Sequence, residues 1–366
     1  MKKTVSVLLK PAADRCNMRC TYCFYTHEAE NRKKTPCGFM SVQTMRTAVH
    51  KVLEYADGGD VYLVFQGGEP LLVGLPFYEE VLRAVKKYNR LHSRVFYSLQ
   101  TNGVGLTPAF ASFFAKNGFL LGVSLDGTAE IHNTYRRAVN GDATFESVTR
   151  GISLLREYRV EFNILTVVTN AVAEAIDTIY AFYREQGFNF LQFIPFIPQV
   201  RGGGPIPEIL SVEKYTAFLL RVFELWQAEI ESGHYRSVTH LDQIGSFLLG
   251  YPYTSCSTRG VCANQLVIEA DGTVYPCDFF AGDVHCIGNI LVDEMTALTV
   301  NRIEELWRED MQRQRESCKS CPYFAVCRGG CARYFTNGQH MYCESLKTFY
   351  SEKLKDFQST VRKIRL

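Results

Sequence analysis

The sequence predicts an α/β fold: an open, partial parallel barrel of six strand–helix units, followed by a smaller cysteine-rich domain. Three observations predict this fold, namely the chain length, the alternation of apolar and amphipathic segments, and the spacing of the cysteines. The chain has 366 residues, of which 46% are hydrophobic and 13 are cysteines. At about 150 residues per domain, this length favours two domains, and the composition is that of an ordinary globular protein.

Six short apolar runs, rich in Val, Ile, Leu and Phe, have the composition of strands that are buried on both faces. They lie at residues 6–10, 61–66, 95–100, 120–125, 162–168 and 188–196. Amphipathic segments that are typical of helices alternate with them, at 41–57, 74–90, 108–117, 145–158, 171–186 and 212–232. Strands and helices that alternate in this way form a parallel sheet with right-handed crossovers. Because six units are fewer than the eight of a closed barrel, we expect a partial (β/α)6 TIM-like barrel.

The pattern changes near residue 250, where loops become frequent and two short strands, at 265–269 and 273–276, are expected to form a hairpin. Asp271 and Gly272 supply its turn. Further helices are expected near 300–314 and in the basic final stretch, 344–366. The expected parts of the chain are the barrel at 1–235, the cysteine-rich domain at 236–345 and a terminal helix at 346–366.

Charge and hydropathy exclude several classes of protein. With 40 Lys and Arg against 38 Asp and Glu, the formal net charge of +2 gives no broad attraction to nucleic acid or to an anionic membrane. No apolar run approaches the roughly 18 residues of a membrane helix. The short apolar run that ends at Lys10 is expected to be a strand rather than a signal peptide. We therefore expect a cytoplasmic protein that binds neither nucleic acid nor membrane.

Most of the cysteines lie in two dense groups, which is typical of metal ligands in a reducing compartment. The first group, Cys16, Cys20 and Cys23, has the spacing C-x3-C-x2-C in the loop after the first strand, where barrel enzymes place their active sites. Three thiolates can bind three irons of a [4Fe–4S] cluster and leave the fourth iron open for a substrate. Zinc is the alternative, with His27 as a possible fourth ligand, although three cysteines from one loop make a poor zinc site.

This spacing, with the aromatic Tyr22 before the last cysteine, resembles the signature of the radical S-adenosylmethionine enzymes. The resemblance implies a partial (β/α)6 barrel whose open iron chelates the amino and carboxylate groups of S-adenosylmethionine. One electron from the cluster then yields a 5′-deoxyadenosyl radical, which abstracts hydrogen from an unactivated carbon. By the same resemblance, Tyr22 belongs to the cofactor-binding loop.

Motifs at the ends of later strands extend the resemblance. Residues 66–70, Gln-Gly-Gly-Glu-Pro, follow the second strand and resemble the family's glycine motif, in which the absent side chain lets the backbone approach the methionine ammonium group. The resemblance implies that Gly68 contributes this contact. It also implies that Ser124 and Arg136 meet the ribose and carboxylate, and that Ile197 meets the adenine. Taken alone, each of these residues could be a cap, a turn or a surface position.

The second cysteine group has eight thiols, enough for two fully ligated [4Fe–4S] clusters. Its spacing resembles that of SPASM domains, which follow the barrel in radical enzymes that modify peptides. The resemblance assigns one auxiliary cluster to Cys256, Cys262, Cys277 and Cys331, and the other to Cys318, Cys321, Cys327 and Cys343. Two zinc ribbons would use the same thiols and are the alternative. Cys37 and Cys286 are left over, and we expect both to be small buried apolar residues.

Over its whole length the sequence is similar to the anaerobic sulfatase-maturating enzymes, most clearly at 16–25, 64–70, 98–103, 161–169, 190–195 and 271–279. The resemblance implies oxidation of a Cys or Ser side chain to Cα-formylglycine in an unfolded or nascent sulfatase polypeptide with a Cys/Ser-x-Pro-x-Arg type of motif. It also implies three [4Fe–4S] clusters, S-adenosylmethionine as cosubstrate, and an electron donor such as flavodoxin or ferredoxin. Whether the target is Cys or Ser stays open at this point.

Asp278 directly follows the predicted ligand Cys277 and matches the family's proposed base, which takes the proton of the target thiol or hydroxyl. By resemblance, Tyr25 and Gln66 hold the target side chain. The alternative for Asp278 is a hydrogen bond to an amide of its own loop, which a short carboxylate accepts readily.

Two other functions compete with sulfatase maturation. Another SPASM enzyme, such as a thioether-forming peptide maturase, would keep the same clusters, but its usual peptide-recognition domain is not expected in the short segment before the first strand. An iron–sulfur electron carrier without catalysis would need neither the open three-cysteine site nor the glycine motif.

Overall fold

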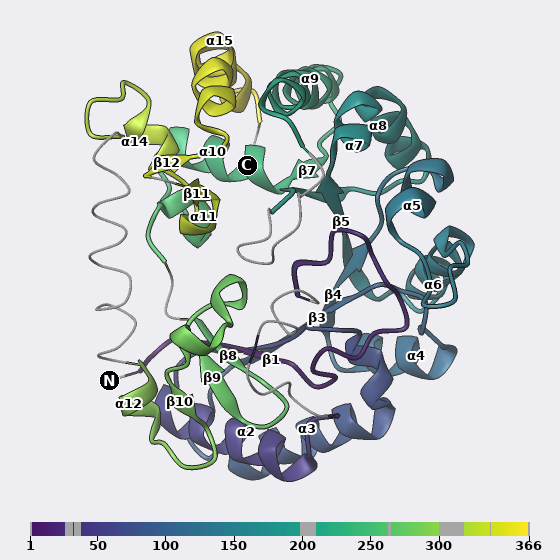
Figure 1. Cartoon of the computed structure of the whole chain (residues 1–366), viewed down its shortest axis with the longest axis vertical. Coiled ribbons are helices and arrows are strands. Elements are labelled where there is room, and N and C mark those ends of the chain that lie inside the picture. Colours follow the sequence, from purple (N-terminus) through teal and green to yellow (C-terminus); the bar gives the residue numbers. More distant parts are fainter. Residues whose placement is uncertain are drawn as a thin grey trace. The chain divides into compact units, whose positions relative to one another are not determined.

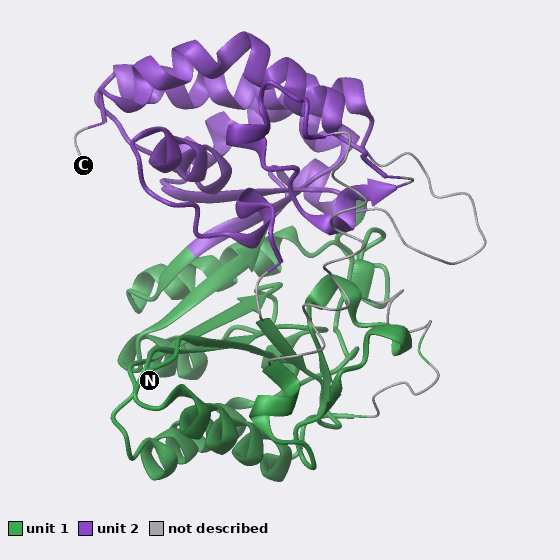
Figure 2. Ribbon diagram, turned by 90° about the vertical axis from the view of Figure 1, so that its left-hand side faces the viewer, with its two compact units in different colours: residues 1–124, 135–162, 264–306 green, residues 125–134, 163–263, 307–366 purple. Residues whose placement is uncertain are grey.

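The computed structural model describes residues 2–25, 32, 38–197, 210–262, 265–299, 318–336 and 338–364. The chain divides into two compact units, shown in different colours in Figure 2. Unit 1 contains Met1–Ser124, Tyr135–Phe162 and Asn264–Leu306, and unit 2 contains Leu125–Thr134, Asn163–Ala263 and Trp307–Leu366. Each unit thus combines segments that are distant in sequence, and the domain boundaries expected at 235 and 345 stay a prediction.

Unit 1 is built on a parallel sheet. Its strands β1 (Val5–Leu9), β2 (Val61–Phe65), β3 (Val95–Thr101) and β4 (Phe119–Ser124) pair in that order, and every pairing among them is parallel. Along the chain they alternate with the helices α2 (Val42–Ala56), η1 (Pro70–Val73), α3 (Leu75–Tyr88), α4 (Pro108–Lys116) and α6 (Phe145–Glu157) (Figure 1). The strands and helices predicted for this region are confirmed, with ends that differ by only a residue or two.

Local signals explain where two of these helices begin and end. The hydroxyl of Ser41 accepts a hydrogen bond from the backbone N–H of Thr44 at 2.9 Å and caps α2. Thr107 caps α4 in the same way, and Pro108 occupies its first turn. Gly118 follows α4 with φ +65°, a conformation that glycine adopts without strain.

The predicted hairpin is confirmed and extends the sheet of unit 1. Its strands β8 (Gln265–Ile268) and β9 (Thr273–Tyr275) pair antiparallel, and β9 also pairs with β10 (Gly288–Asn289). Strand β8 pairs in parallel with β1, so β1 lies between β2 and β8. The sequence does not predict this last pairing, which adds a late segment of the chain to the first strand.

Unit 2 contains most of β5 (Glu161–Val168), which pairs in parallel with β6 (Phe190–Pro195), and β6 pairs in parallel with β7 (Ser237–Val238). The prediction of a single helix at 171–186 is wrong in one detail. It consists of α7 (Asn170–Glu174) and α8 (Ile176–Glu185), because the backbone at Ala175 has φ −99° and ψ 17°.

The predicted helices at 212–232 and at the end of the chain are α9 (Val212–Glu231) and α15 (Cys343–Val361). They pack against each other, with the ring centroids of Phe223 and Phe357 5.0 Å apart. The remaining helices and strands are short: α5 (Ala129–Tyr135), α10 (Thr239–Leu248), α11 (Cys256–Arg259), η2 (Asp278–Phe280), η3 (Asp283–His285), α12 (Met295–Thr299), α14 (Phe324–Cys327), η5 (Ala332–Tyr334), β11 (Phe335–Thr336) and β12 (Gln339–His340).

Two sequence expectations, the helix near 300–314 and the burial of Cys37, fall outside the described residues. The expectation for Cys286 is wrong, because this residue is exposed. It follows η3 in a surface turn, where its thiol donates to the backbone oxygen of Gly288 at 3.7 Å. Among the residues that the structure describes, no helix combines the length and apolar character of a membrane span.

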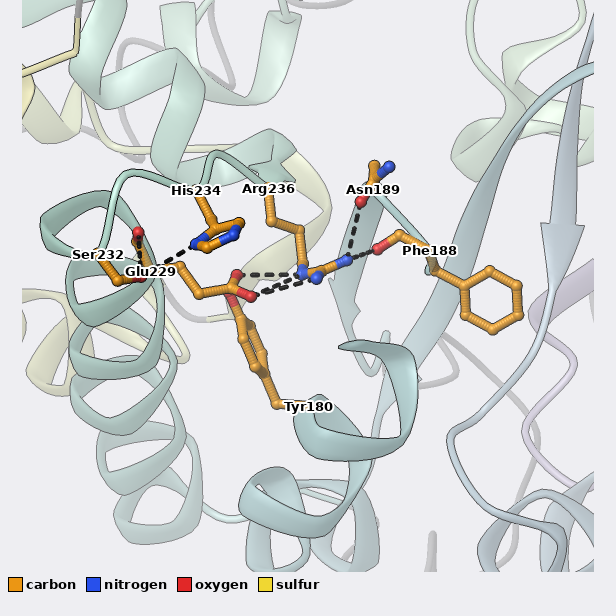
Figure 3. A network of polar contacts seen from close by, with 7 residues as sticks. All are labelled: Tyr180, Phe188, Asn189, Glu229, Ser232, His234 and Arg236. Carbon is orange, nitrogen blue, oxygen red and sulfur yellow. Dashed lines mark hydrogen bonds and ion pairs between the residues drawn. The ribbon is translucent and has the colours of Figure 1, made fainter. Parts of the chain in front are cut away.

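A buried polar network stabilises unit 2 near the end of α9 (Figure 3). The Glu229 carboxylate accepts hydrogen bonds from the Tyr180 hydroxyl at 2.7 Å and from Nε and Nη2 of Arg236 at 3.0 and 3.1 Å. Arg236 also donates to the backbone oxygen of Phe188 and to the side chain of Asn189. Because both charges are buried, each depends on the other for compensation.

We predict that Glu229→Gln lowers the free energy of unfolding by about 3–5 kcal/mol, because it leaves the Arg236 guanidinium buried without an anionic partner. Denaturant unfolding measures the loss. The matched control is Glu231→Gln on the same helix, which removes an exposed ion pair with Lys363 of 2.9 Å and is expected to cost less than about 1 kcal/mol. Equal losses in the two variants would contradict the prediction.

Candidate active site

The first cysteine group lies in a loop that follows β1 and runs antiparallel to a second segment of unit 1. The cysteines of this loop are Cys16, Cys20 and Cys23. The backbone N–H of Thr21 donates to the carbonyl oxygen of Tyr135 at 3.0 Å, and Met18 and Ala138 form an isolated β-bridge. This pairing, together with the hydrogen bond from the Cys23 N–H to the Cys20 oxygen at 3.1 Å, fixes the backbone of the loop.

Hydrogen-bond donors surround the first of these thiols. The backbone N–H of Met18 and the side-chain amide of Asn102 lie 3.4 and 3.7 Å from the Cys16 sulfur. Burial raises the pKa of the Cys16 thiol to about 12 against the lowering effect of the Met18 N–H, and the nearby Cys20 and Cys23 add to the rise. Thiols gathered in this way favour a cationic ligand that replaces their protons, with N–H donors to stabilise the sulfur charge.

The glycine motif packs directly against this loop. The backbone N–H of Glu69 donates to the carbonyl oxygen of Arg15 at 2.8 Å. Gly68 has φ +49°, and a Cβ atom at this position would lie 2.2 Å from the same oxygen. Any side chain at residue 68 would therefore separate the motif from the cysteine loop.

The Glu69 carboxylate connects the ends of β2 and β3. It accepts hydrogen bonds from the backbone N–H groups of Leu71 and Asn102 at 3.0 and 2.7 Å and from the Thr101 hydroxyl at 2.7 Å. Burial raises the pKa of Glu69 to about 7, although these hydrogen bonds act to lower it. Sequence reasoning treated Glu69 only as part of a turn motif and missed this structural role.

Three neighbouring parallel strands end at the same level of the sheet in unit 1. Leu9 of β1 is paired with Phe65 of β2 on one side and with Ile268 of β8 on the other. The next residue is Lys10 after β1, Gln66 after β2 and Glu269 after β8. Because they occupy the same position along adjacent strands, their side chains leave the same edge of the sheet, which is the carboxyl edge.

Lys10 contacts two of the predicted site residues, and a third is bound to one of them. Its side chain is 0% exposed, and its ammonium forms an ion pair with the Asp278 carboxylate. The other oxygen of Asp278 accepts a hydrogen bond from Nε2 of Gln66 at 3.0 Å. The Lys10 ammonium also lies 3.4 Å from the centroid of the Tyr25 ring, in cation–π geometry. Asp278, Gln66 and Tyr25, predicted from three separate motifs, thus meet around a lysine that the sequence analysis assigned to no site.

The hydroxyl of Tyr25 is hydrogen-bonded to the carboxylate of a second ion pair, which Glu269 forms with Arg32. It donates to both oxygens of Glu269, at 2.9 and 2.8 Å, and Nη1 of Arg32 donates to the same carboxylate at 2.8 Å. Burial and the Glu269 charge raise the pKa of Tyr25 well above its ordinary value, so the hydroxyl stays a donor. Burial alone would lower the pKa of Arg32, but the Glu269 carboxylate raises it, so the guanidinium stays charged.

The residues that are expected to bind S-adenosylmethionine lie in both units. The Arg136 guanidinium lies 4.0 Å from the Cys20 sulfur and 5.3 Å from the Tyr22 ring centroid, so these three predicted residues are brought together. Ser124 is buried at the end of β4, and Ile197 is buried in unit 2 just after β6. The cofactor contacts of these residues and of Gly68 stay predictions.

The thiols expected for one auxiliary cluster lie together in unit 2. Cys327 ends α14 and Cys343 begins α15, while the backbone N–H of Cys321 donates to the oxygen of Cys318 at 3.1 Å. Burial raises the pKa of Cys327 to about 11, and the other three cysteines add to the rise because they lie nearby. Of the other expected set, Cys256, Cys262 and Cys331 belong to unit 2, whereas Cys277 follows β9 in unit 1.

The chemistry of these donors fits iron–sulfur clusters, because each expected set consists of cysteine thiols. None of the cysteines that the structure describes forms a disulfide. Within the described ranges, no three Cys, His, Asp or Glu side chains are gathered tightly enough to hold one ion.

Comparison with known proteins identifies the class. Residues 11–182 match the radical SAM superfamily, and residues 256–331 match an iron–sulfur cluster-binding domain, the SPASM domain. The chain is therefore a radical S-adenosylmethionine enzyme with a cluster-binding C-terminal domain. The predicted fold class, enzyme class and [4Fe–4S] and S-adenosylmethionine cofactors are confirmed.

Full-length relatives narrow this class. The chain is 39% identical over 359 residues to the cysteine-type anaerobic sulfatase-maturating enzyme of Clostridium novyi, covering 96% of both chains. It is 29% identical to the serine-type enzyme of Klebsiella pneumoniae, covering 95% of this chain and 87% of that one. The solved structure of native anSMEcpe with bound AdoMet has a TM-score of 0.92 at 36% identity, covering 98% of this chain and 100% of that one. The chain belongs to the anaerobic sulfatase-maturating enzymes.

We predict that Gly68→Ala disrupts the first cluster, because its Cβ would meet the Arg15 carbonyl oxygen at 2.2 Å. Iron content after anaerobic reconstitution should fall from about 12 to about 8 atoms per chain, with loss of S-adenosylmethionine cleavage. Gly105→Ala is the control, since a Cβ at Gly105 would meet the side chain of Leu71 at 3.7 Å, which is an ordinary contact. Full iron content in Gly68→Ala would contradict the packing argument.

Proposed function

We propose that this chain oxidises a cysteine side chain of a sulfatase polypeptide to Cα-formylglycine, with Asp278 as the base. The observation that carries the proposal is the meeting of Asp278, Gln66 and Tyr25 at the carboxyl edge of the unit 1 sheet. These three residues come from the η2 turn, the glycine motif and the cysteine loop. Membership of the family supplies the reaction class, and this cluster supplies the residues that would meet the target.

The reaction balances as three losses from the target cysteine followed by hydrolysis. The side chain loses a hydrogen atom from Cβ, a proton from the thiol and one further electron, which leaves a thioaldehyde. Water then replaces the sulfur, giving the aldehyde and hydrogen sulfide. When bound, S-adenosylmethionine and the first cluster supply the 5′-deoxyadenosyl radical that takes the hydrogen atom, and the auxiliary clusters supply the electron acceptor.

The environment of Asp278 supports its role as the proton acceptor. Its carboxylate is almost fully buried and is held by Lys10 and Gln66, one at each oxygen. Each carboxylate oxygen has two lone pairs, so both can accept a further proton donor. A carboxylate already held by charged and polar partners on the protein has little need to reorganise when a thiol approaches it.

Cysteine is the target we favour over serine. The cysteine-type enzymes of Clostridium novyi and Clostridium perfringens are 37–39% identical to this chain, whereas the serine-type enzymes are 28–30% identical. A structure of native anSMEcpe with bound AdoMet and the Cp18Cys peptide is also similar, with a TM-score of 0.92 at 35% identity. We further propose the cytoplasm as the compartment and flavodoxin or ferredoxin as the electron donor, since reduced thiols and a low-potential reductant suit the clusters.

We predict that the reduced protein converts a Cys-x-Pro-x-Arg peptide to its formylglycine form and produces 5′-deoxyadenosine. Mass spectrometry follows the thiol-to-aldehyde change, with Ser and Ala versions of the same peptide as controls. The Cys peptide should react at least tenfold faster than the Ser peptide, and the Ala peptide should be unchanged. Deoxyadenosine formation with all three peptides unmodified would refute this function.

We predict that Asp278→Asn slows formylglycine formation by about 10²-fold or more, because the amide accepts no proton from the thiol. The variant should retain about 12 irons per chain, since each of three four-iron clusters keeps its cysteines. Asp293→Asn, in the loop after β10, is a control outside the site. An unaltered rate in Asp278→Asn would remove the proposed base.

A further inference from the structure

The proposed reaction leaves one central charged residue without a role. Lys10 is the first residue after β1, and its side chain has no exposed surface. It therefore does not reach the substrate directly. Its ammonium instead contacts the two residues that are proposed to do so, by an ion pair to Asp278 and by the 3.4 Å approach to the Tyr25 ring centroid.

The path of the Lys10 side chain is fixed by its surroundings. Gly67 has φ +92°, and a Cβ atom at this position would lie 2.6 Å from Cδ of Lys10. The glycine motif therefore also makes room for the lysine stem. Position 10 shares its face of the sheet with Leu8, which packs in a buried apolar cluster with Val267 and Tyr275. Between these neighbours the side chain extends so that its ammonium meets the Asp278 carboxylate.

The charges around Lys10 balance within the described part of unit 1. The groups that face one another are two cations, Lys10 and Arg32, and two carboxylates, Asp278 and Glu269, with the Tyr25 ring and hydroxyl between the pairs. Buried charges are tolerated when each has a partner of opposite sign at contact distance. Removing one member therefore frees its partner to rotate toward other donors or water.

We propose that Lys10 is a positioning residue that holds the Asp278 carboxylate in one orientation toward the target side chain. The proposal rests on the proposed function, because it acts through Asp278. Lys10 binds one oxygen of the Asp278 carboxylate and Gln66 Nε2 binds the other, so rotation of the carboxylate in either direction would break both contacts. The remaining lone pairs then point in fixed directions, and a misplacement of about 1 Å would cost about 10²-fold in rate.

The test compares Lys10→Met with wild type and with Lys51→Met. Methionine keeps an unbranched stem but has no charge and no N–H donor. Lys51 is a lysine of α2 whose ammonium donates to the backbone oxygen of Asp293 at 2.8 Å and lies 3.8 Å from the Glu294 carboxylate. The measured quantities are formylglycine formed per 5′-deoxyadenosine, kcat and KM for the Cys peptide, and iron per chain.

For Lys10→Met we expect at least a tenfold fall in formylglycine per deoxyadenosine, at full iron content and with KM changed less than threefold. Lys51→Met should match wild type. A wild-type ratio in Lys10→Met overturns the positioning role while leaving the proposed function intact. If wild type itself forms no formylglycine, the proposed function fails, and the inference fails with it.

A double variant covers the case in which Lys10→Met does not fold because Asp278 is left buried and unpaired. Lys10→Met with Asp278→Asn removes both charges and so leaves neither partner uncompensated. Compared with Asp278→Asn alone, the double variant should change the product ratio less than twofold, because Lys10 acts through Asp278. A further tenfold fall would show that Lys10 acts elsewhere and would overturn the proposal.

Discussion

The candidate site depends on the parallel pairing of β1 with two strands, β2 and β8. Strand β2 is the next described strand after β1, but β8 comes from the cysteine-rich part of the chain, far along the sequence. Because Leu9 is in register with both neighbours, the residues after the three strands emerge side by side. The loops of the first cluster and of the glycine motif begin at the same edge. The hairpin that contains β8 leads to the predicted cluster ligand Cys277 and to Asp278, so one alignment of strands places all these groups.

A polar cluster at this edge, formed by Lys10, Tyr25, Arg32, Glu269 and Asp278, joins the cysteine loop to the proposed base. Tyr25 comes two residues after Cys23, and its ring lies beside Lys10 while its hydroxyl is bound to Glu269. Asp278 comes directly after Cys277 and is held by Lys10 and Gln66. A radical reaction needs its proton acceptor fixed before the radical forms, because a reactive intermediate allows little time for reorganisation. Compensated buried charges provide that fixed geometry.

Sequence patterns predicted the chemistry of the chain well and its internal contacts only in part. The strands and helices that were predicted for unit 1, and that the structure describes, have the predicted bounds to within a residue or two, because apolar periodicity and caps such as Thr107 act locally. The break at Ala175 and the exposure of Cys286 were missed, since neither follows from a pattern of residue types. Glu69 and Lys10 were also missed as site residues. A charged residue at the very end of an apolar strand was the one signal for Lys10.

The sequence by itself determined the class of chemistry, because cysteine spacing, a glycine motif and an aspartate beside a cysteine are properties of short segments. It also determined which loops carry them, since the order of strands and helices is set by local periodicity. Only the tertiary structure decided that β8 pairs with β1, and therefore that Lys10 faces Asp278 while Tyr25 faces Glu269. The reason is physical: pairing between distant strands depends on the complementary burial of two surfaces, which neither strand specifies alone.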